Sequence, residues 1–272
     1  MNVAIIGCGY VGTAVAKCWQ QKMTLLITVT TTTPERVNEL QSIAQKVIVL
    51  QGDNREALES LLQGQDCVLL SVAPKRGNAY EETYLQTAQT VVSALKKSPV
   101  KQLIYTGTCS VYGNQNGELV DEETTTKPTN ENQKILNDTE QVLLTELAGI
   151  HVCILRLGGI YGPNRELVKI YSRIAGQTRP GDGSEPSNWI HLDDIVGAIE
   201  FARHHQLQGI YNLVDDANLL NREVIDSVCK THNLPPVTWD TSQPANRNYN
   251  ARISNQKIKA AGYKFIHPQM IF

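Results

Sequence analysis

The chain alternates short apolar runs with stretches in which apolar residues recur every three or four positions. The periodic stretches predict helices, among them one after the first apolar run and a long one over residues 78–97. Strands are predicted for five of the apolar runs, at residues 2–6, 23–30, 47–50, 67–72 and 101–106. This alternation indicates an α/β fold with a doubly wound parallel sheet, in which ligands bind beyond the carboxyl ends of the strands.

The first strand leads into a glycine-punctuated turn and then into a helix. Gly7, Gly9 and Gly12 have the G-x-G-x-x-G spacing, in which the glycines allow a tight turn, close approach of the backbone to a pyrophosphate and close helix packing. Tyr10 and Val11, at the start of the helix, complete the predicted pyrophosphate loop. The alternative is a glycine-rich turn without a ligand.

The second strand ends where such units recognise the ribose of a dinucleotide. NAD-binding units carry an acidic residue there, whereas this chain has a run of threonines that includes Thr30 and Thr31, followed by Arg36. Hydroxyls, the N–H groups of a helix start at Pro34 and a guanidinium suit a 2′-phosphate, so we expect NADP(H) in preference to NAD(H). The alternatives are an unspecialised capping loop or, because Glu35 is nearby, no such preference.

Two further strand ends are candidates for cofactor contacts. Asp53, after the third strand, either faces the adenine or bonds its own backbone in a turn, and the two interpretations have equal weight. Ser71, Val72 and Ala73 end the fourth strand, where a doubly wound sheet carries its chain past the cofactor. Simple termination of the strand explains these three residues equally well.

Composition narrows the class of partner. The net charge is −2 and no basic run is present, so we expect neither nucleic acid nor a membrane as a partner. The six cysteines lack a C-x-x-C pair, which favours reduced thiols in a cytoplasmic protein, and neither a leader nor a membrane-spanning run is expected. Because the six histidines lack metal-binding spacing, no metal is expected either.

Five further motifs follow one another along the chain. They are TGTCSVYG from residue 106, ILRLGGIYGP from 154, WIHLDDIVGAI from 189, GIYNLVDD from 209 and SNQKIKAAGYKF from 254. In this order they resemble the extended short-chain dehydrogenase/reductases, the superfamily of NAD-dependent sugar-nucleotide epimerases and dehydratases. The resemblance covers nearly the whole chain and implies a Rossmann-type fold.

The resemblance also assigns residues to a reaction site. It implies that Thr108 binds the reacting oxygen of the substrate, and that Ser110 lines the same pocket. Thr106, Gly158 and Gly159 are implied as cofactor contacts, because they belong to the motifs that follow the fifth and sixth strands. An unknown small molecule is the expected substrate.

One expected pair of residues is missing from the sequence. Members of this superfamily carry Tyr-x-x-x-Lys on the next helix, with the tyrosine as acid/base and the lysine on the ribose. Counting back from Lys134 gives Asn130, whereas alignment on Glu140 places the pair at Asn132 and Leu136. An amide does not exchange protons near neutral pH as a phenol does, so the chain resembles an atypical member.

Three other side chains are alternative candidates for the acid/base role of that tyrosine. Tyr112 and Tyr161 belong to the V-Y-G and I-Y-G motifs, in which packing is the simpler role for the ring. His191 titrates in a useful range but, at a strand end beside two aspartates, is more often structural.

The expected organisation is a dinucleotide-binding domain over residues 1–155, followed by a region over 156–272 that completes the sheet and forms a small substrate-binding lobe. A homodimer built from the helices at 78–97 and 133–147 is implied by the resemblance. Two functions stay open. One is an NADP(H)-dependent oxidoreductase or epimerase acting on a small or sugar-like hydroxyl or carbonyl substrate, and the other is a non-catalytic NADP(H)-binding sensor or scaffold.

Overall fold

The computed structural model describes residues 1–74, 80–245 and 249–272, which form two compact units. The chain passes between the units several times. One passage, at Arg156–Leu157, lies beside the boundary expected after residue 155. Unit 1 comprises Met1–Thr108, Glu131–Arg156 and Val196–Tyr211, and unit 2 comprises Cys109–Asn130, Leu157–Ile195 and Asn212–Phe272.

Unit 1 is built on a sheet in which the described residues form seven strands, ordered β11-β7-β5-β4-β1-β2-β3. These strands are β1 (Asn2–Ile6), β2 (Leu26–Thr31), β3 (Lys46–Val49), β4 (Cys67–Leu70), β5 (Gln102–Thr108), β7 (His151–Leu157) and β11 (Gly209–Leu213). The pairs β1–β2, β1–β4, β2–β3 and β4–β5 are parallel, which confirms the predicted doubly wound sheet. The strand order reverses between β1 and β4, where such folds bind ligands.

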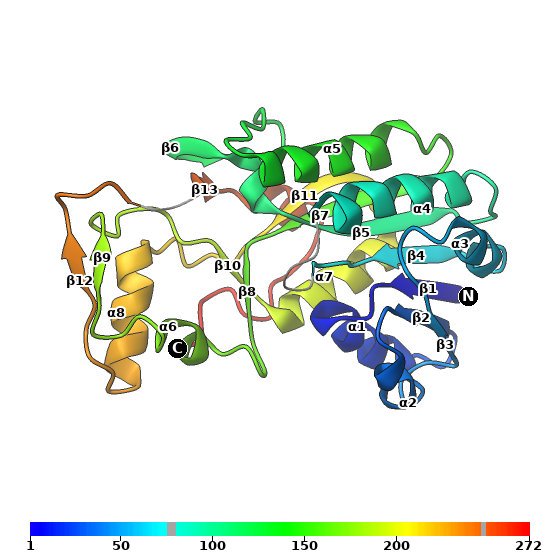
Figure 1. Cartoon of the computed structure of the whole chain (residues 1–272), viewed down its shortest axis with the longest axis horizontal. Coiled ribbons are helices and arrows are strands. Elements are labelled where there is room, and N and C mark those ends of the chain that lie inside the picture. The colour runs from blue at the N-terminus through cyan, green and yellow to red at the C-terminus, as the bar shows by residue number, and fades with distance from the viewer. Residues whose placement is uncertain (75–79, 246–248) are drawn as a thin grey trace. The chain divides into compact units, whose positions relative to one another are not determined.

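Helices cover both faces of this sheet (Figure 1). They are α1 (Tyr10–Gln20), α2 (Val37–Leu40), α3 (Arg55–Leu62), α4 (Thr87–Leu95), α5 (Glu131–Thr145) and α7 (Leu192–His205), with a 3₁₀ turn at Pro34–Arg36 and a π-helical turn at Glu82–Gln86. Of the helix expected over residues 78–97, Asn78 and Ala79 lie outside the described residues. On one face α1 meets α7, where the Trp19 indole N–H donates to Glu200 at 2.9 Å.

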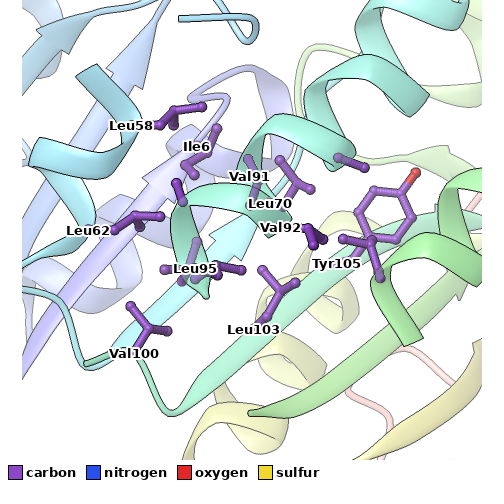
Figure 2. Packing of buried hydrophobic residues seen from close by; sticks show 14 of the residues in the cluster. Ile6, Leu58, Leu62, Leu70, Val91, Val92, Leu95, Val100, Leu103 and Tyr105 are labelled. Carbon is purple, nitrogen blue, oxygen red and sulfur yellow. The ribbon is translucent and has the colours of Figure 1, made fainter. Parts of the chain in front are cut away.

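The other face carries α3, α4 and α5 and holds a large apolar core. Figure 2 shows Leu62 of α3 and Leu95 of α4 packed with Leu70 and Leu103 of the sheet. Strands covered on both faces need apolar side chains in both directions, which explains why β1 and β4 are almost uninterrupted apolar runs. This packing holds the carboxyl ends of the strands in place.

Unit 2 contains short strands and helices. They are a 3₁₀ turn (Cys109–Tyr112), β6 (Asn114–Val120), β8 (Gly159–Tyr161), α6 (Leu167–Tyr171), β9 (Thr178–Pro180), β10 (Trp189–His191), α8 (Asn221–Thr231), β12 (Thr238–Asp240), β13 (Asn250–Ile253) and α9 (Gln256–Ala260). The pairs β8–β10, β9–β12 and β6–β13 are parallel. Val224 and Val228 of α8 belong to the same apolar cluster as Leu167 and Tyr171 of α6.

All six cysteines are free thiols, as expected, and Cys18 is half-buried while the others are buried. Burial raises the pKa of both Cys67 and Cys153 to about 12, which makes these thiols unreactive in the folded chain. Among the described residues, every helix is too short or too polar to cross a membrane.

Candidate functional site

The loop between β1 and α1 has the backbone that its glycines permit. Gly7 has a φ of +92°, and a Cβ on it would lie 2.4 Å from the Ser71 carbonyl oxygen. A Cβ on Gly12 would lie 2.5 Å from the Gly7 carbonyl oxygen, so α1 starts as close to the strand as the chain allows. Both glycines are therefore required by the fold of the loop itself.

Gly9 differs from the other two glycines of the loop. A Cβ added to it would meet nothing within 4 Å, and the residue is exposed. Tyr10 and Val11 follow as the first residues of α1, whose first turn contains no acidic residue. An open backbone at the positive end of an eleven-residue helix fits the pyrophosphate of a dinucleotide.

The end of β2 supports this loop. The Thr30 hydroxyl accepts the Gly7 N–H at 3.0 Å, and the Thr31 hydroxyl accepts the Thr33 N–H at 3.1 Å. Both hydroxyls, predicted to read the ribose, are used here to shape the backbone. Thr33 precedes the 3₁₀ turn without a side-chain cap.

Arg36 connects that turn to the glycine loop. Its guanidinium donates to the Cys8 carbonyl oxygen, to the Thr13 hydroxyl at 3.2 Å and to both oxygens of Glu39 at 3.1 Å. The hydrogen bond from Arg36 lowers the pKa of the Glu39 carboxyl. A phosphate that binds Arg36 therefore competes with an exposed carboxylate.

The ends of β4 and β5 meet beside the glycine loop. The Thr106 hydroxyl donates to the Ser71 hydroxyl at 3.0 Å, and Val72 would lie 3.0 Å from a Cβ on Gly7. The structure thus brings together four predicted cofactor contacts, from three strands, at the point where the strand order reverses. Ala73 follows and is exposed.

Asp53 lies in the turn between β3 and α3. It is exposed in the turn before α3, and Asn54 beside it caps that helix by accepting the Ala57 N–H at 3.1 Å. A Cβ on the preceding Gly52 would lie 2.2 Å from the Thr87 hydroxyl, so α4 packs directly against this turn.

Strand β5 is longer than predicted. The expectation of a loop from Thr106 was wrong, because the strand continues to Thr108, and the 3₁₀ turn Cys109–Tyr112 follows. Thr108 ends unit 1 and Ser110 belongs to unit 2, and both are half-buried. Hydrogen bonding along a strand uses backbone groups only, so polar side chains at its end do not terminate it.

The segment where the tyrosine and lysine are expected starts α5. Asn130 precedes the helix, and Asn132 and Lys134 are exposed on it, whereas Leu136 is only 3% exposed. Further along α5, Glu140 is buried and receives two donors of Arg156, the closer at 2.7 Å. A Cβ on Gly107 would lie 3.0 Å from Glu140, so this ion pair lies directly beneath the end of β5.

Gly158 and Gly159, predicted as cofactor contacts, pack within unit 2. A Cβ on Gly158 would lie 2.8 Å from the Asn188 carbonyl oxygen, and one on Gly159 would lie 2.8 Å from the Trp189 ring. The space that each missing side chain leaves is therefore filled by β10 and the residue before it.

The three alternative acid/base residues also lie in unit 2. The Tyr112 hydroxyl donates to Asn212 at 2.9 Å in the interior. Burial raises the pKa of Tyr161 to about 12, and its hydroxyl accepts the Ile271 N–H at 3.3 Å. Burial, followed by the nearby His267, lowers the pKa of His191, whose Nδ1 accepts the Asp193 N–H at 3.2 Å.

Comparison with known proteins decides the family. The family model described as "NAD dependent epimerase/dehydratase family" matches residues 3–213. The chain belongs to this family. Membership in the epimerase/dehydratase family agrees with the resemblance carried by the motifs and with the open glycine loop.

Two relatives match most of this chain. Protein YeeZ of Escherichia coli K12 is 27% identical over 98% of this chain and 96% of its own length. An N-acetyl-alpha-D-glucosaminyl-diphospho-ditrans,octacis-undecaprenol 4-epimerase of E. coli O157:H7 is 26% identical over 84% of this chain and 71% of its own.

Solved structures share the fold of this family member. DesIV, a dTDP-glucose 4,6-dehydratase of Streptomyces venezuelae solved with NAD and TYD bound, has a TM-score of 0.81 at 20% identity, over 100% of this chain and 93% of its own. A functionally unknown conserved protein from Silicibacter pomeroyi has a TM-score of 0.79 at 22% identity, over 98% of this chain and 94% of its own.

Sequence reasoning missed two features of the site. The hydrogen bond from Arg36 to the Cys8 carbonyl oxygen could not be predicted from the sequence, because every residue has a backbone carbonyl. The Glu140–Arg156 pair did have one: Arg156 stands inside an apolar run, and a charge on a buried strand needs a buried partner.

Proposed function

We propose that the protein is an NAD(P)-dependent oxidoreductase or epimerase that acts on a hydroxyl or carbonyl group of a small or sugar-like molecule. The observation that carries the proposal is the open backbone at Gly9 in a loop whose Gly7 packs against Ser71, the residue that accepts the Thr106 hydroxyl. Two relatives with named activities, a dTDP-glucose 4,6-dehydratase and an N-acetyl-alpha-D-glucosaminyl-diphospho-ditrans,octacis-undecaprenol 4-epimerase, support the same class of reaction.

The chain's own residues divide into two groups in this proposal. The glycine loop, Tyr10 and Val11 hold the pyrophosphate, and Ser71, Val72 and Thr106 border the rest of the cofactor. When bound, the dinucleotide supplies the site that accepts or returns a hydride. Thr108 and Ser110, two positions apart in the chain, bind the reacting oxygen of the substrate and polarise it.

Proton transfer at this site uses a nonstandard route. Asn130 or Asn132, which align with the family tyrosine in the two possible alignments, orients a substrate hydroxyl but does not exchange its proton. The lysine position is Lys134 in the first alignment and Leu136 in the second, and Leu136 has no charge to lower a neighbouring pKa. The proton therefore passes through water or a group of the substrate itself.

We also propose that the cofactor is NADP(H). Support comes from the lack of an acidic residue in the threonine run after β2 and from Arg36, which is held beside the glycine loop by Cys8 and Thr13. A planar guanidinium binds a phosphate at two points, whereas it gains nothing from a ribose hydroxyl of NAD. Titration calorimetry with NADP⁺ and NAD⁺ tests this preference directly.

Activity is tested with sugar nucleotides and small carbonyl compounds. Chromatography of the products detects epimerisation, and the absorbance of NADPH detects net reduction. We expect turnover that Thr108→Ala lowers at least about a hundredfold, since an oxyanion donor is lost. Thr90→Ala, which changes a hydroxyl bonded within α4, serves as the matched control.

Two results would contradict the proposal. Turnover that is unchanged in Thr108→Ala would remove that residue from the reaction. Tight dinucleotide binding without conversion of any compound, together with a protein partner whose affinity changes with NADP(H), would instead identify a regulatory scaffold.

A further inference from the structure

Two neighbouring residues and one that is distant in the sequence meet in unit 2. His191 ends β10, Asp193 lies in the first turn of α7, and His267 comes from the segment after α9. One ligand atom of each lies within 4.8 Å of the others. All three residues belong to unit 2, whereas the glycine loop belongs to unit 1.

Two of the three distances between these atoms match the distances between ligands of one shared ion. His267 Nε2 lies 2.9 Å and His191 Nδ1 lies 3.4 Å from Asp193 Oδ2. Ligand atoms about 2.1 Å from one metal ion are about 3.0 Å apart at right angles and about 3.4 Å apart at tetrahedral angles. Both measured edges lie within or next to this range.

The cluster is held by a buried support. Asp194 is fully buried, and its carboxylate accepts the N–H groups of Ile266 at 2.6 Å and of His267 at 2.9 Å. It also accepts the Tyr263 hydroxyl at 3.0 Å. These bonds fix the backbone of the C-terminal segment, so that the His267 ring lies beside the His191 ring, with centroids 4.1 Å apart and ring planes tilted by 59°.

Solvent reaches the cluster from one side, and a backbone N–H competes with an ion for one of its nitrogen atoms. His191 is 9% exposed, whereas His267 is 23% and Asp193 is 52% exposed, so solvent reaches one side. Water molecules therefore have room to complete the coordination of an ion. The Asp193 N–H, 3.2 Å from His191 Nδ1, competes for that lone pair, but at the long end of the hydrogen-bond range.

We propose that His191, Asp193 and His267 form a binding site for a divalent transition-metal ion of the Zn²⁺ type. Two imidazoles and one carboxylate suit Zn²⁺, Co²⁺ or Ni²⁺, whereas Mg²⁺ and Ca²⁺ prefer oxygen ligands alone. The bound ion joins the start of α7 to the C-terminal segment. It thereby stabilises the folded chain in addition to its hydrogen bonds.

Zn²⁺ alone is the probe in the first experiment. Calorimetric titration of the metal-free protein should give one site per chain, and His267→Gln and Asp193→Asn should each weaken it at least about tenfold. The matched control is the double variant His204→Gln with His205→Gln, which removes two neighbouring histidines at the other end of α7 and should leave that site unchanged.

Co²⁺ absorption identifies the ligands independently of affinity. Nitrogen and oxygen ligands give only d–d bands, whereas a cysteine ligand adds an intense thiolate charge-transfer band. The proposal is overturned by a thiolate band, by Zn²⁺ binding that survives in both single variants, or by loss of binding in the control variant alone. Because Asp193 is exposed, Asp193→Asn should fold normally even if His267→Gln does not.

Discussion

The two units use glycine for different purposes. In unit 1, Gly9 leaves open space where its side chain would be, and that space lies at the start of a helix. In unit 2, the equivalent space at Gly158 and Gly159 is already filled by Asn188 and Trp189. A glycine in a family motif therefore indicates a ligand only where the rest of the chain leaves its space empty.

The units also differ in how they bury a carboxylate. Glu140 in unit 1 is 1% exposed at its side chain and receives a guanidinium at 2.7 Å. Asp215 in unit 2 accepts one N–H, from Ala217 at 3.1 Å, and its Oδ2 has no hydrogen-bond partner among the described residues. Glu140 thus has a cation beside it, whereas burial without one raises the pKa of Asp215 to about 7.

The largest expected effect follows from removing the cation in unit 1. Arg156→Met leaves Glu140 buried without a counter-charge and should lower the free energy of unfolding by about 3–5 kcal/mol. Urea denaturation measures this loss. Lys96→Met, which breaks an exposed pair with Glu146, is the control and should cost less than about 1 kcal/mol. Equal losses would show that burial of the pair is irrelevant.

The dependence of stability on pH tests the contrast between Asp215 and Glu140. Burial raises the pKa of this carboxyl from 3.8 to about 7 in the folded chain, so folding takes up a proton between these values. The associated stability is fully present below pH 4 and is lost as the pH rises through 7, by at most about 4 kcal/mol. Asp215→Asn should remove this slope from a series of denaturation curves, and an unchanged slope would assign it to other groups.

The glycine comparison gives a pair of substitutions with opposite readouts. Gly158→Ala should lower the free energy of unfolding by about 2 kcal/mol, because its Cβ meets a backbone oxygen. Gly9→Ala should cost less, about 1 kcal/mol, because the space is open but the backbone there, with φ −83° and ψ −146°, favours glycine. It should instead weaken dinucleotide binding at least about tenfold, or 1.4 kcal/mol.

These two glycine variants are measured in the same two assays, thermal unfolding and calorimetric titration of NADP⁺. A Gly9→Ala protein that binds the dinucleotide normally would mean that the open space is not the pyrophosphate site. A Gly158→Ala protein that keeps its stability but loses binding would move a cofactor contact into unit 2.

The smallest expected effect concerns the competition at Arg36. Glu39→Gln removes the exposed carboxylate that holds this guanidinium, and should raise the affinity for NADP⁺ relative to NAD⁺ about two- to threefold. Glu35→Gln, one position before Arg36, is the control and should leave the ratio of the two dissociation constants unchanged. A weaker preference for NADP⁺ over NAD⁺ in Glu39→Gln would instead indicate that Glu39 positions Arg36 for the phosphate.

The sheet of unit 1 was predictable because most of its strands are buried on both faces, so that they appear in the sequence as runs of apolar residues. The end of β5 was not predictable, because the strand continues through the polar residues Thr106 and Thr108. Strand pairing uses backbone groups, which every residue type has. The motif at Gly158 and Gly159 did not distinguish binding from packing, since the residues that fill their space lie about thirty positions away in the chain. His267 shows the same limit: nothing near it in the sequence places it beside His191.

The reactivity of the buried cysteines reports the local opening of each unit. A thiol reagent reacts with Cys67 and Cys153 only when unit 1 opens, because burial keeps both as protonated thiols, and with Cys229 only when α8 of unit 2 is released. Cys18, half-buried, reacts first and calibrates the reagent. Labelling rates in the native protein therefore measure the opening of each unit separately, without a mutation.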